Sequence, residues 1–111
     1  MEDEDIIRRV LEGNKELFGS LIRKYQKAVY ALAYSRTGSP EEAQDITQET
    51  FLEAFDRLPS LRSPSKFSSW LRSIARNLTV HHLKCKVRRK TVHREMEEIA
   101  GGYPSADEGS S

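Results

Sequence analysis

Every long segment of this chain repeats its apolar residues at intervals of three and four, the spacing that gathers side chains on one face of an α-helix. The longest such stripe comprises Leu17, Phe18, Leu21, Ile22, Tyr25, Val29, Leu32 and Ala33. No segment shows the sustained alternation of apolar and polar residues that is typical of a half-buried strand. Because 111 residues can hold one core, we predict an all-α fold, a small bundle of four main helices.

Glycine, proline and capping residues predict where these helices begin and end. The first helix carries its apolar residues between Ile6 and Leu11 and is expected to end at Gly13, after which Asn14 is a suitable cap for the second helix. The second helix is expected to end at residues 37–38, Thr-Gly.

The third helix has the sharpest start signal. Ser39 can act as N-cap, Pro40 suits the first helical position, and Glu42 completes a capping box. Its predicted buried side comprises Ala43, Ile46, Thr47, Thr50, Phe51, Ala54, Phe55 and Leu58. Pro59 is expected to end it.

A connector rich in serine and proline precedes the fourth helix, which Ser63 or Ser65 is expected to cap. The apolar stripe of this helix comprises Phe67, Trp70, Leu71, Ile74, Ala75, Leu78 and His82. We expect the helix to fray over residues 90–94, so that residues 1–94 form the helical domain. Residues 95–111 are acidic and contain glycine and serine, which predicts a disordered linker or tail.

Charge is strongly segregated along the chain, although the formal net charge is only +1. Residues 62–94 hold ten basic residues and no acidic one, whereas residues 1–61 hold 12 acidic and eight basic residues. Residues 95–111 hold five acidic residues and no basic one. A solvated helix face normally interleaves both signs, so the acid-free block favours a surface that binds a polyanion.

Nothing in the sequence indicates an oxidising compartment or a membrane. Cys85 is the only cysteine, so no intramolecular disulfide can form. The acidic N-terminus is unlike the basic start of a signal peptide, and no apolar run approaches the roughly 20 residues of a membrane span. We expect a cytoplasmic protein without membrane insertion.

The side of the third helix opposite its apolar stripe is predicted to present Asp45, Gln48 and Glu49 on adjoining turns, with Leu52 beside them. Such a patch could dock on a basic partner helix. From composition alone, the plainer interpretation is favoured, because most helix charges are only solvated and acidic residues are stabilised near a helix N-terminus.

The connector and the fourth helix hold residue types that contact nucleic acid. In the connector, Arg62 and Lys66 flank small polar residues and follow Leu61, an apolar residue that could support an unstacked base. The alternative is a plain interhelical loop. In the fourth helix, Asn77 can bond a base edge, whereas Trp70 lies on the apolar stripe and is expected to be mainly structural.

His81, His82 and Cys85 have spacings that bring metal ligands together on a helix. A structural zinc site needs four ligands, however, and no second cysteine follows, so metal binding is disfavoured and no cofactor is expected. No Ser-His-Asp set, carboxylate pair or glycine-rich phosphate motif stands out. We therefore expect a protein that is not an enzyme.

Two segments, residues 45–58 and 66–78, closely resemble region 2 of extracytoplasmic-function (ECF) sigma factors of the sigma-70 family. The first reads DITQETFLEAFDRL and the second KFSSWLRSIARNL. Residues 14–34 fit the same domain, and the resemblance covers roughly residues 5–90. It implies a transcription initiation factor that binds core RNA polymerase and promoter DNA, with an anti-sigma factor as a further partner.

The resemblance also implies which residues meet each partner. The residues implied to dock on the clamp helices of the largest polymerase subunit are Asp45, Gln48, Glu49 and Leu52. The connector and fourth helix would melt the promoter's minus-ten element by capturing its non-template strand. One base would be flipped into a pocket near Leu61, Ser63 and Asn77. The implied DNA-binding residues are Leu61, Arg62, Ser63, Lys66, Arg72, Arg76, Asn77, Lys84, Arg88 and Arg89.

The chain departs from the family pattern at three points. Leu61 stands where the family usually has Phe, which predicts a shallower or differently selective base pocket, and His81 stands where it often has Asp. Nothing after Gly101 is expected to form region 4, the helix-turn-helix domain that reads the upstream promoter element; a fragment and a protein that works with region 2 alone both remain open. So does a sigma-like module that binds polymerase or an anti-sigma factor without DNA, although the acid-free block favours DNA binding.

Overall fold

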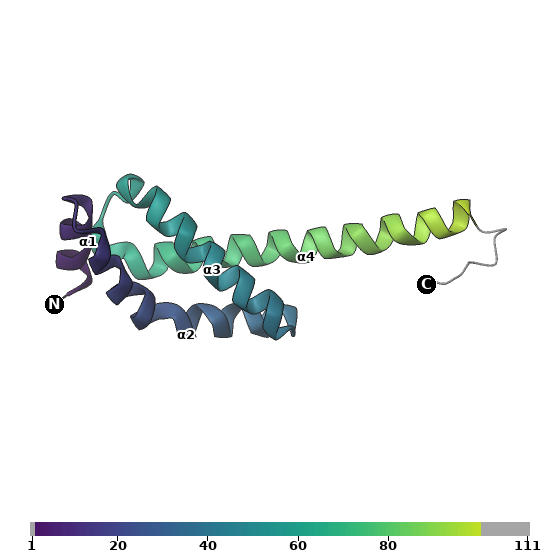
Figure 1. Ribbon diagram of the computed structural model, residues 1–111, viewed down its shortest axis with the longest axis horizontal. Coiled ribbons are helices and arrows are strands. Elements are labelled where there is room, and N and C mark those ends of the chain that lie inside the picture. The colour runs from purple at the N-terminus through teal and green to yellow at the C-terminus, as the bar shows by residue number, and fades with distance from the viewer. Residues whose placement is uncertain (1, 101–111) are drawn as a thin grey trace. The chain divides into compact units, whose positions relative to one another are not determined.

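The computed structural model describes residues 2–100, and that part of the chain consists of four α-helices joined by short 3-10 turns (Figure 1). The helices are α1 (Asp3–Leu11), α2 (Phe18–Thr37), α3 (Pro40–Arg57) and α4 (Phe67–Ile99). The turns are η1 (Lys15–Leu17), η2 (Leu58–Ser60) and η3 (Pro64–Lys66). The described residues contain no strand, and the predicted all-α bundle is confirmed.

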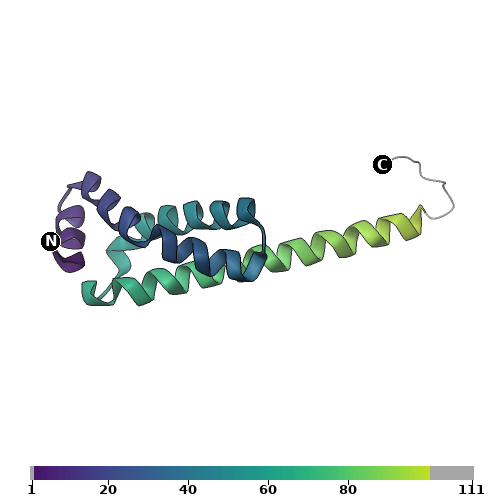
Figure 2. The same ribbon diagram turned by 90° about the horizontal axis from the view of Figure 1, so that it is seen from below.

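Within the described part of the chain, residues 2–81 form one compact unit and residues 82–100 form a second. In the first unit α2 and α3 lie side by side as an antiparallel pair (Figure 2). Apolar residues from all four helices meet in one core, whose largest fully buried members include Ile7, Leu21, Phe67 and Leu71. Full burial of one such side chain is worth about 1.5–3 kcal/mol, so this core holds the helices together.

The boundaries of α2 and α3 agree with the sequence-based expectation. Gly38 follows α2 in the left-handed conformation, with φ of 66°, which glycine adopts without a steric penalty. Pro40 is the first residue of α3, and the N–H of Glu42 donates to Ser39 Oγ at 3.3 Å. This bond caps one of the donors that a helix start leaves without a backbone partner.

Side-chain caps predicted at two other helix starts are not formed. Neither Asn14 nor Ser63 makes a side-chain capping bond, because a 3-10 turn precedes the helix in each case, and the hydroxyl of Ser65, the alternative cap, is hydrogen bonded to that of Ser63. The backbone satisfies donors there instead: the Leu17 N–H donates to the Asn14 carbonyl at 3.2 Å, and the Lys66 N–H donates to the Ser63 carbonyl at 2.9 Å.

The fourth helix is longer than predicted, since α4 continues beyond residues 90–94 to Ile99. Its last ten residues include neither glycine nor proline, and His93 pairs with Glu97 one turn later at 3.7 Å. Residues 101–111 of the predicted linker lie outside the described part of the chain. Within residues 2–100, no helix has the length and apolar character needed to cross a membrane.

Candidate nucleic-acid interface and docking face

The outer side of α3 presents the four predicted docking residues together. Ile46, Thr50 and Ala54 point into the bundle, which turns Asp45, Gln48, Glu49 and Leu52 outward. All four of these side chains are exposed, and Leu52 is 71% accessible despite being a large apolar residue. We call this set the docking face; an exposed leucine between acidic and amide groups is suited to a basic, partly apolar partner.

An apolar groove of about 470 Å³ adjoins the docking face between α2 and α3. It is lined by Phe18, Ile22, Gln26, Thr47, Gln48, Phe51, Leu52 and Phe55. Periodicity alone assigned Phe55 to the core, but its side chain is 37% accessible. Sequence reasoning missed this groove because its existence depends on how far α2 and α3 stand apart, which no local pattern encodes.

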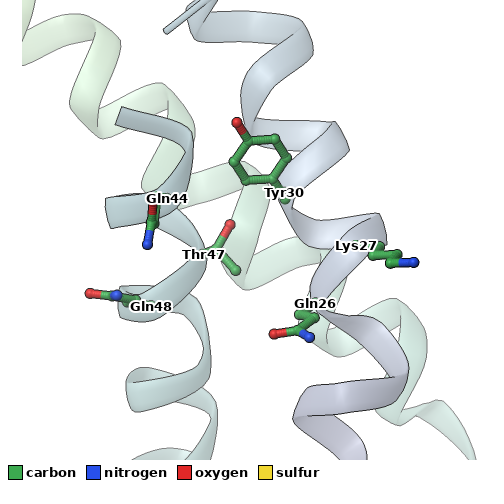
Figure 3. Close-up of a pocket in the computed structure, with 6 residues that line it drawn as sticks. All are labelled: Gln26, Lys27, Tyr30, Gln44, Thr47 and Gln48. Carbon is green, nitrogen blue, oxygen red and sulfur yellow. The ribbon is translucent and has the colours of Figure 1, made fainter. Parts of the chain in front are cut away.

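A polar hollow of about 390 Å³ continues the groove along the same pair of helices (Figure 3). Gln26, Lys27 and Tyr30 come from α2, whereas Gln44, Thr47 and Gln48 come from α3. Figure 3 shows the Thr47 side chain directed across the gap toward Tyr30. The Gln26 amide and the Thr47 hydroxyl can form hydrogen bonds in this gap, whereas the Gln44 and Gln48 amides point away from it (Figure 3).

The connector builds a separate cavity of about 530 Å³, which we call the connector pocket. It is lined by Ser60, Leu61, Arg62, Ser63, Lys66, Ser69, Trp70 and Ser73. Four predicted DNA-binding residues, Leu61 to Ser63 and Lys66, are thus brought together around one hollow. Leu61 also packs against the core, which anchors the connector to the bundle.

Trp70 has a dual position in the structure. As expected from the apolar stripe, its side chain packs against the core, with its ring centroid 6.0 Å from that of Phe67. It also forms part of the wall of the connector pocket, although the sequence predicted a mainly structural role for this residue. An aromatic wall beside basic residues is a surface on which a base can stack.

Two serines of α4, Ser69 and Ser73, line the connector pocket and were not among the predicted DNA-binding residues. The hydroxyl of Ser69 donates to the Lys66 carbonyl at 3.2 Å, and that of Ser73 donates to the Ser69 carbonyl at 3.1 Å. These bonds fix the hydroxyls on the α4 surface with lone pairs left to accept from a ligand. Their spacing of one helical turn is a signal that could have identified them.

The remaining predicted DNA-binding residues lie on α4 outside the pocket lining. Arg72, Arg76 and Asn77 are exposed, and Asn77 follows Ser73 by four residues, so it continues the same face one turn further along the helix. Lys84, Arg88 and Arg89 are exposed as well. These three residues belong to the second unit.

The residues that line the connector pocket include the basic Arg62 and Lys66 and no Asp or Glu. Such a surface raises the local concentration of a polyanion and holds phosphates. Within residues 2–100, no group of three or more His, Cys, Asp or Glu side chains is placed to hold a metal ion. The arrangement is thus one for binding a negatively charged, partly aromatic ligand.

Residues 21–89 match the family described as Sigma-70 region 2. This chain belongs to that family. The ECF resemblance is also confirmed: the domain is 36% identical over 88 residues to the RNA polymerase sigma-H factor of Pseudomonas aeruginosa, covering 79% of this chain and 46% of that protein. It is 36% identical over 80 residues to the ECF sigma factor SigW of Bacillus subtilis, covering 72% and 43%. The region 2 domain spans about half the length of these curated relatives.

A solved structure has the same fold. It is the NMR structure of an engineered region 2 of sigmaE in complex with GTAAAA, with a TM-score of 0.73 and 32% sequence identity. The match covers 80% of this chain and 93% of the sigmaE chain. The helices of this region 2 domain are therefore arranged as in a sigma fragment that was solved with a short nucleic-acid sequence.

Proposed function

We propose that this region 2 domain docks on core RNA polymerase and captures the unpaired non-template strand of a promoter's minus-ten element. The observation that carries the proposal is the connector pocket, where Arg62 and Lys66 flank a hollow walled by Leu61 and Trp70. Basic groups suit phosphates, and apolar and aromatic walls suit an unstacked base. The sigmaE fragment, similar over most of its length, was solved with GTAAAA.

Strand capture explains how such a domain melts DNA without catalysis. A base can enter the connector pocket only after it leaves the duplex stack, which costs a few kcal/mol. Contacts made only with the flipped base and its phosphates shift the equilibrium toward the open strand. In this proposal Leu61, Ser63 and Asn77 meet the base. The side chains that hold phosphates are Arg62, Lys66, Arg72, Arg76, Lys84, Arg88 and Arg89.

The docking face is proposed to meet the clamp helices of the largest polymerase subunit. Asp45 and Glu49 supply charge that complements a basic helix, and the exposed Leu52 supplies an apolar contact. The adjoining groove between α2 and α3 supports a further partner, an anti-sigma factor that competes for the same face. The protein is accordingly proposed to act by binding in the cytoplasm and not as an enzyme.

Co-purification tests this function directly. Core polymerase is immobilised, loaded with the domain, and then exposed to a labelled single-stranded oligonucleotide that contains GTAAAA. Retention of the oligonucleotide above the polymerase-only background supports the proposal. Retention of the domain without any gain in oligonucleotide would favour the interaction module that binds polymerase without DNA.

A further inference from the structure

The first residue of α1 is tied to α2 by two polar contacts. The Asp3 carboxylate accepts hydrogen bonds from the Tyr25 hydroxyl and from Lys24 Nζ, the latter at 2.9 Å. The Asp3 side chain is only 19% accessible, and its bond with Tyr25 is partly buried, whereas the Lys24 side chain is 58% accessible and its bond lies at the surface. Lys24 Nζ also lies 5.3 Å from the centroid of the Tyr25 ring. We call the set Asp3, Lys24 and Tyr25 the α1 junction.

The α1 junction lies against the connector. Helix α1 contacts the turn η3, and the two share a polar hollow of about 470 Å³. That hollow is lined by Glu2, Asp3, Glu4, Lys24, Pro64, Ser65 and Ser68. Figures 1 and 2 both show α1 at the end of the bundle where the connector leads into α4. The turn that precedes α4 is thus supported from one side by α1.

The same turn lies next to the connector pocket. Pro64 and Ser65 line the hollow beside α1, whereas Ser63 and Lys66 line the connector pocket. Ser63 Oγ and Ser65 Oγ are hydrogen bonded at 2.9 Å, which links the two linings directly. A shift of η3 away from α1 would therefore displace residues of the connector pocket.

An aromatic chain links the α1 junction to the opposite wall of the pocket. The ring centroid of Tyr25 lies 5.7 Å from that of Phe67, and Phe67 lies 6.0 Å from Trp70. Phe67 is 1% accessible, so it is held firmly between the two. Both the η3 side and the Trp70 side of the connector pocket consequently depend on where Tyr25 is held.

We infer that Asp3 and Tyr25 are positioning residues for the connector pocket, holding η3 and the Phe67–Trp70 pair in the geometry that discriminates among unpaired bases. The inference rests on the proposed function, because it assigns to the α1 junction the specificity of that same pocket. A site built partly on a loop needs such support, since side chains held loosely lose both affinity and selectivity. Neither residue would touch DNA itself.

DNA binding is measured with the full chain loaded on core RNA polymerase, using fluorescent single strands that contain GTAAAA or its single-base substitutions, whereas folding and fluorescence are measured on the full chain alone. Tyr25→Phe removes one hydroxyl and keeps the ring, and Asp3→Asn removes one charge at nearly constant size. The matched control is Asp5→Asn, which removes the same charge from α1 at an exposed pair, Asp5–Arg8 at 3.0 Å, outside the hollow lined by Asp3. Circular dichroism sets the measurement temperature well below the unfolding midpoint of every variant.

We expect Asp3→Asn and Tyr25→Phe each to weaken binding of the best oligonucleotide about threefold to tenfold, the equivalent of one lost hydrogen bond. The affinity ratio between the best and substituted sequences should shrink in both, whereas Asp5→Asn should keep that ratio. The double variant should bind the oligonucleotide no more weakly than the single variant with the lower affinity, because both substitutions disrupt the same contact between Asp3 and Tyr25. A residue needed only for stability would lower the unfolding midpoint and leave the ratio unchanged.

The fluorescence of Trp70 gives a second measurement, which needs no DNA. Because Trp70 is the only tryptophan in the chain, the emission of the free protein reports on this residue. Its emission and acrylamide quenching should change in Tyr25→Phe and not in Asp5→Asn. If the wild type discriminates among oligonucleotides and both junction variants keep its affinity and ratio, the inference is overturned while the proposed function stands. If core polymerase loaded with the wild type binds no more oligonucleotide than core polymerase alone, the proposed function fails. In that case unchanged Trp70 fluorescence in Tyr25→Phe overturns the positioning role too.

Discussion

The fold places the carboxylate of Asp3 beside Lys24 and Tyr25, where both side chains donate hydrogen bonds to it. Burial alone would raise its pKa, but hydrogen bonds from Tyr25 and Lys24 outweigh this, and the pKa of Asp3 lies below its ordinary value. Burial and the bond to Asp3 raise the pKa of Tyr25 above its ordinary value. The folded state thus favours a charged Asp3 beside a neutral Tyr25, with Glu2 and Glu4 lining the same hollow.

This pairing predicts a pH window for stability. Because the pKa of Asp3 is lowered on folding, its contribution is present above the unfolded value near 4 and is lost as the pH falls through the folded value. The raised pKa of Tyr25 means that its contribution is lost as the pH rises beyond about 10. Urea unfolding should show Asp3→Asn to be about 1–2 kcal/mol less stable at pH 7, with a smaller difference in the free energy of unfolding at pH 3. A difference that is unchanged at pH 3 would contradict the account.

Two neighbouring residues of α4 should have separable effects on DNA. Replacing Arg76 with Ala should lower affinity for all single strands alike and reduce the salt slope by about 0.7, the value for one phosphate contact. Replacing Asn77 with Ala should instead change the preference among bases, because an amide bonds base edges. Binding curves for the polymerase-bound domain at several salt concentrations distinguish these effects. Wild-type affinity and preference in both variants would remove α4 from the DNA interface.

At the scale of elements, α3 carries the core on one side and the docking face on the other. Reversing the charge of Asp45 or Glu49 to Lys should therefore weaken polymerase binding at little cost to the fold. The free energy of unfolding should change by no more than about 0.5 kcal/mol, the usual range for exposed substitutions. Glu12→Lys makes the same charge reversal at an exposed position after α1 and serves as control. Polymerase affinity equal to that of the control would mean that another face docks.

Helix positions could be predicted from the sequence to the extent that they depend on local chemistry. The spacing of Leu21 and Val29, and the Ser39 cap, determine which residues are buried and where α3 begins. The caps expected at Asn14 and Ser63 were wrong because 3-10 turns satisfy backbone donors without side chains. The end of α4 was placed too early: residues 67–100 contain neither glycine nor proline, so no helix-ending residue stands before Gly101.

The candidate sites could likewise be predicted where their residues are neighbours in the sequence, and not where they come from distant segments. Leu61, Arg62 and Ser63 are consecutive, so a resemblance in sequence was enough to group them. The contact of Asp3 with Tyr25 joins residues 22 positions apart on different helices, and it follows from how α1 crosses α2. Such a crossing is set by packing of the whole core and leaves no mark in local periodicity.

For the molecule as a whole, opposite charges on different elements serve two proposed partners. The docking face on α3 is acidic, whereas the connector and α4 up to Arg94 hold ten basic residues and no acidic one. If the docking face and the DNA-binding surface carried the same charge, one of them would repel its proposed partner, because polymerase offers a basic helix and DNA is a polyanion. The arrangement accordingly supports simultaneous binding of a basic protein surface and a nucleic-acid strand.

The central claim is capture of an unpaired strand by the polymerase-bound domain, and a comparison of strands tests it most directly. The same labelled GTAAAA-containing strand is titrated, alone and annealed to its complement, with core polymerase in the presence and absence of the domain. The account predicts that the domain raises affinity for the unpaired strand, with a dependence on base identity, and leaves the fully paired duplex near the polymerase-only value. Equal gains for paired and unpaired DNA, or no gain for either, would contradict it.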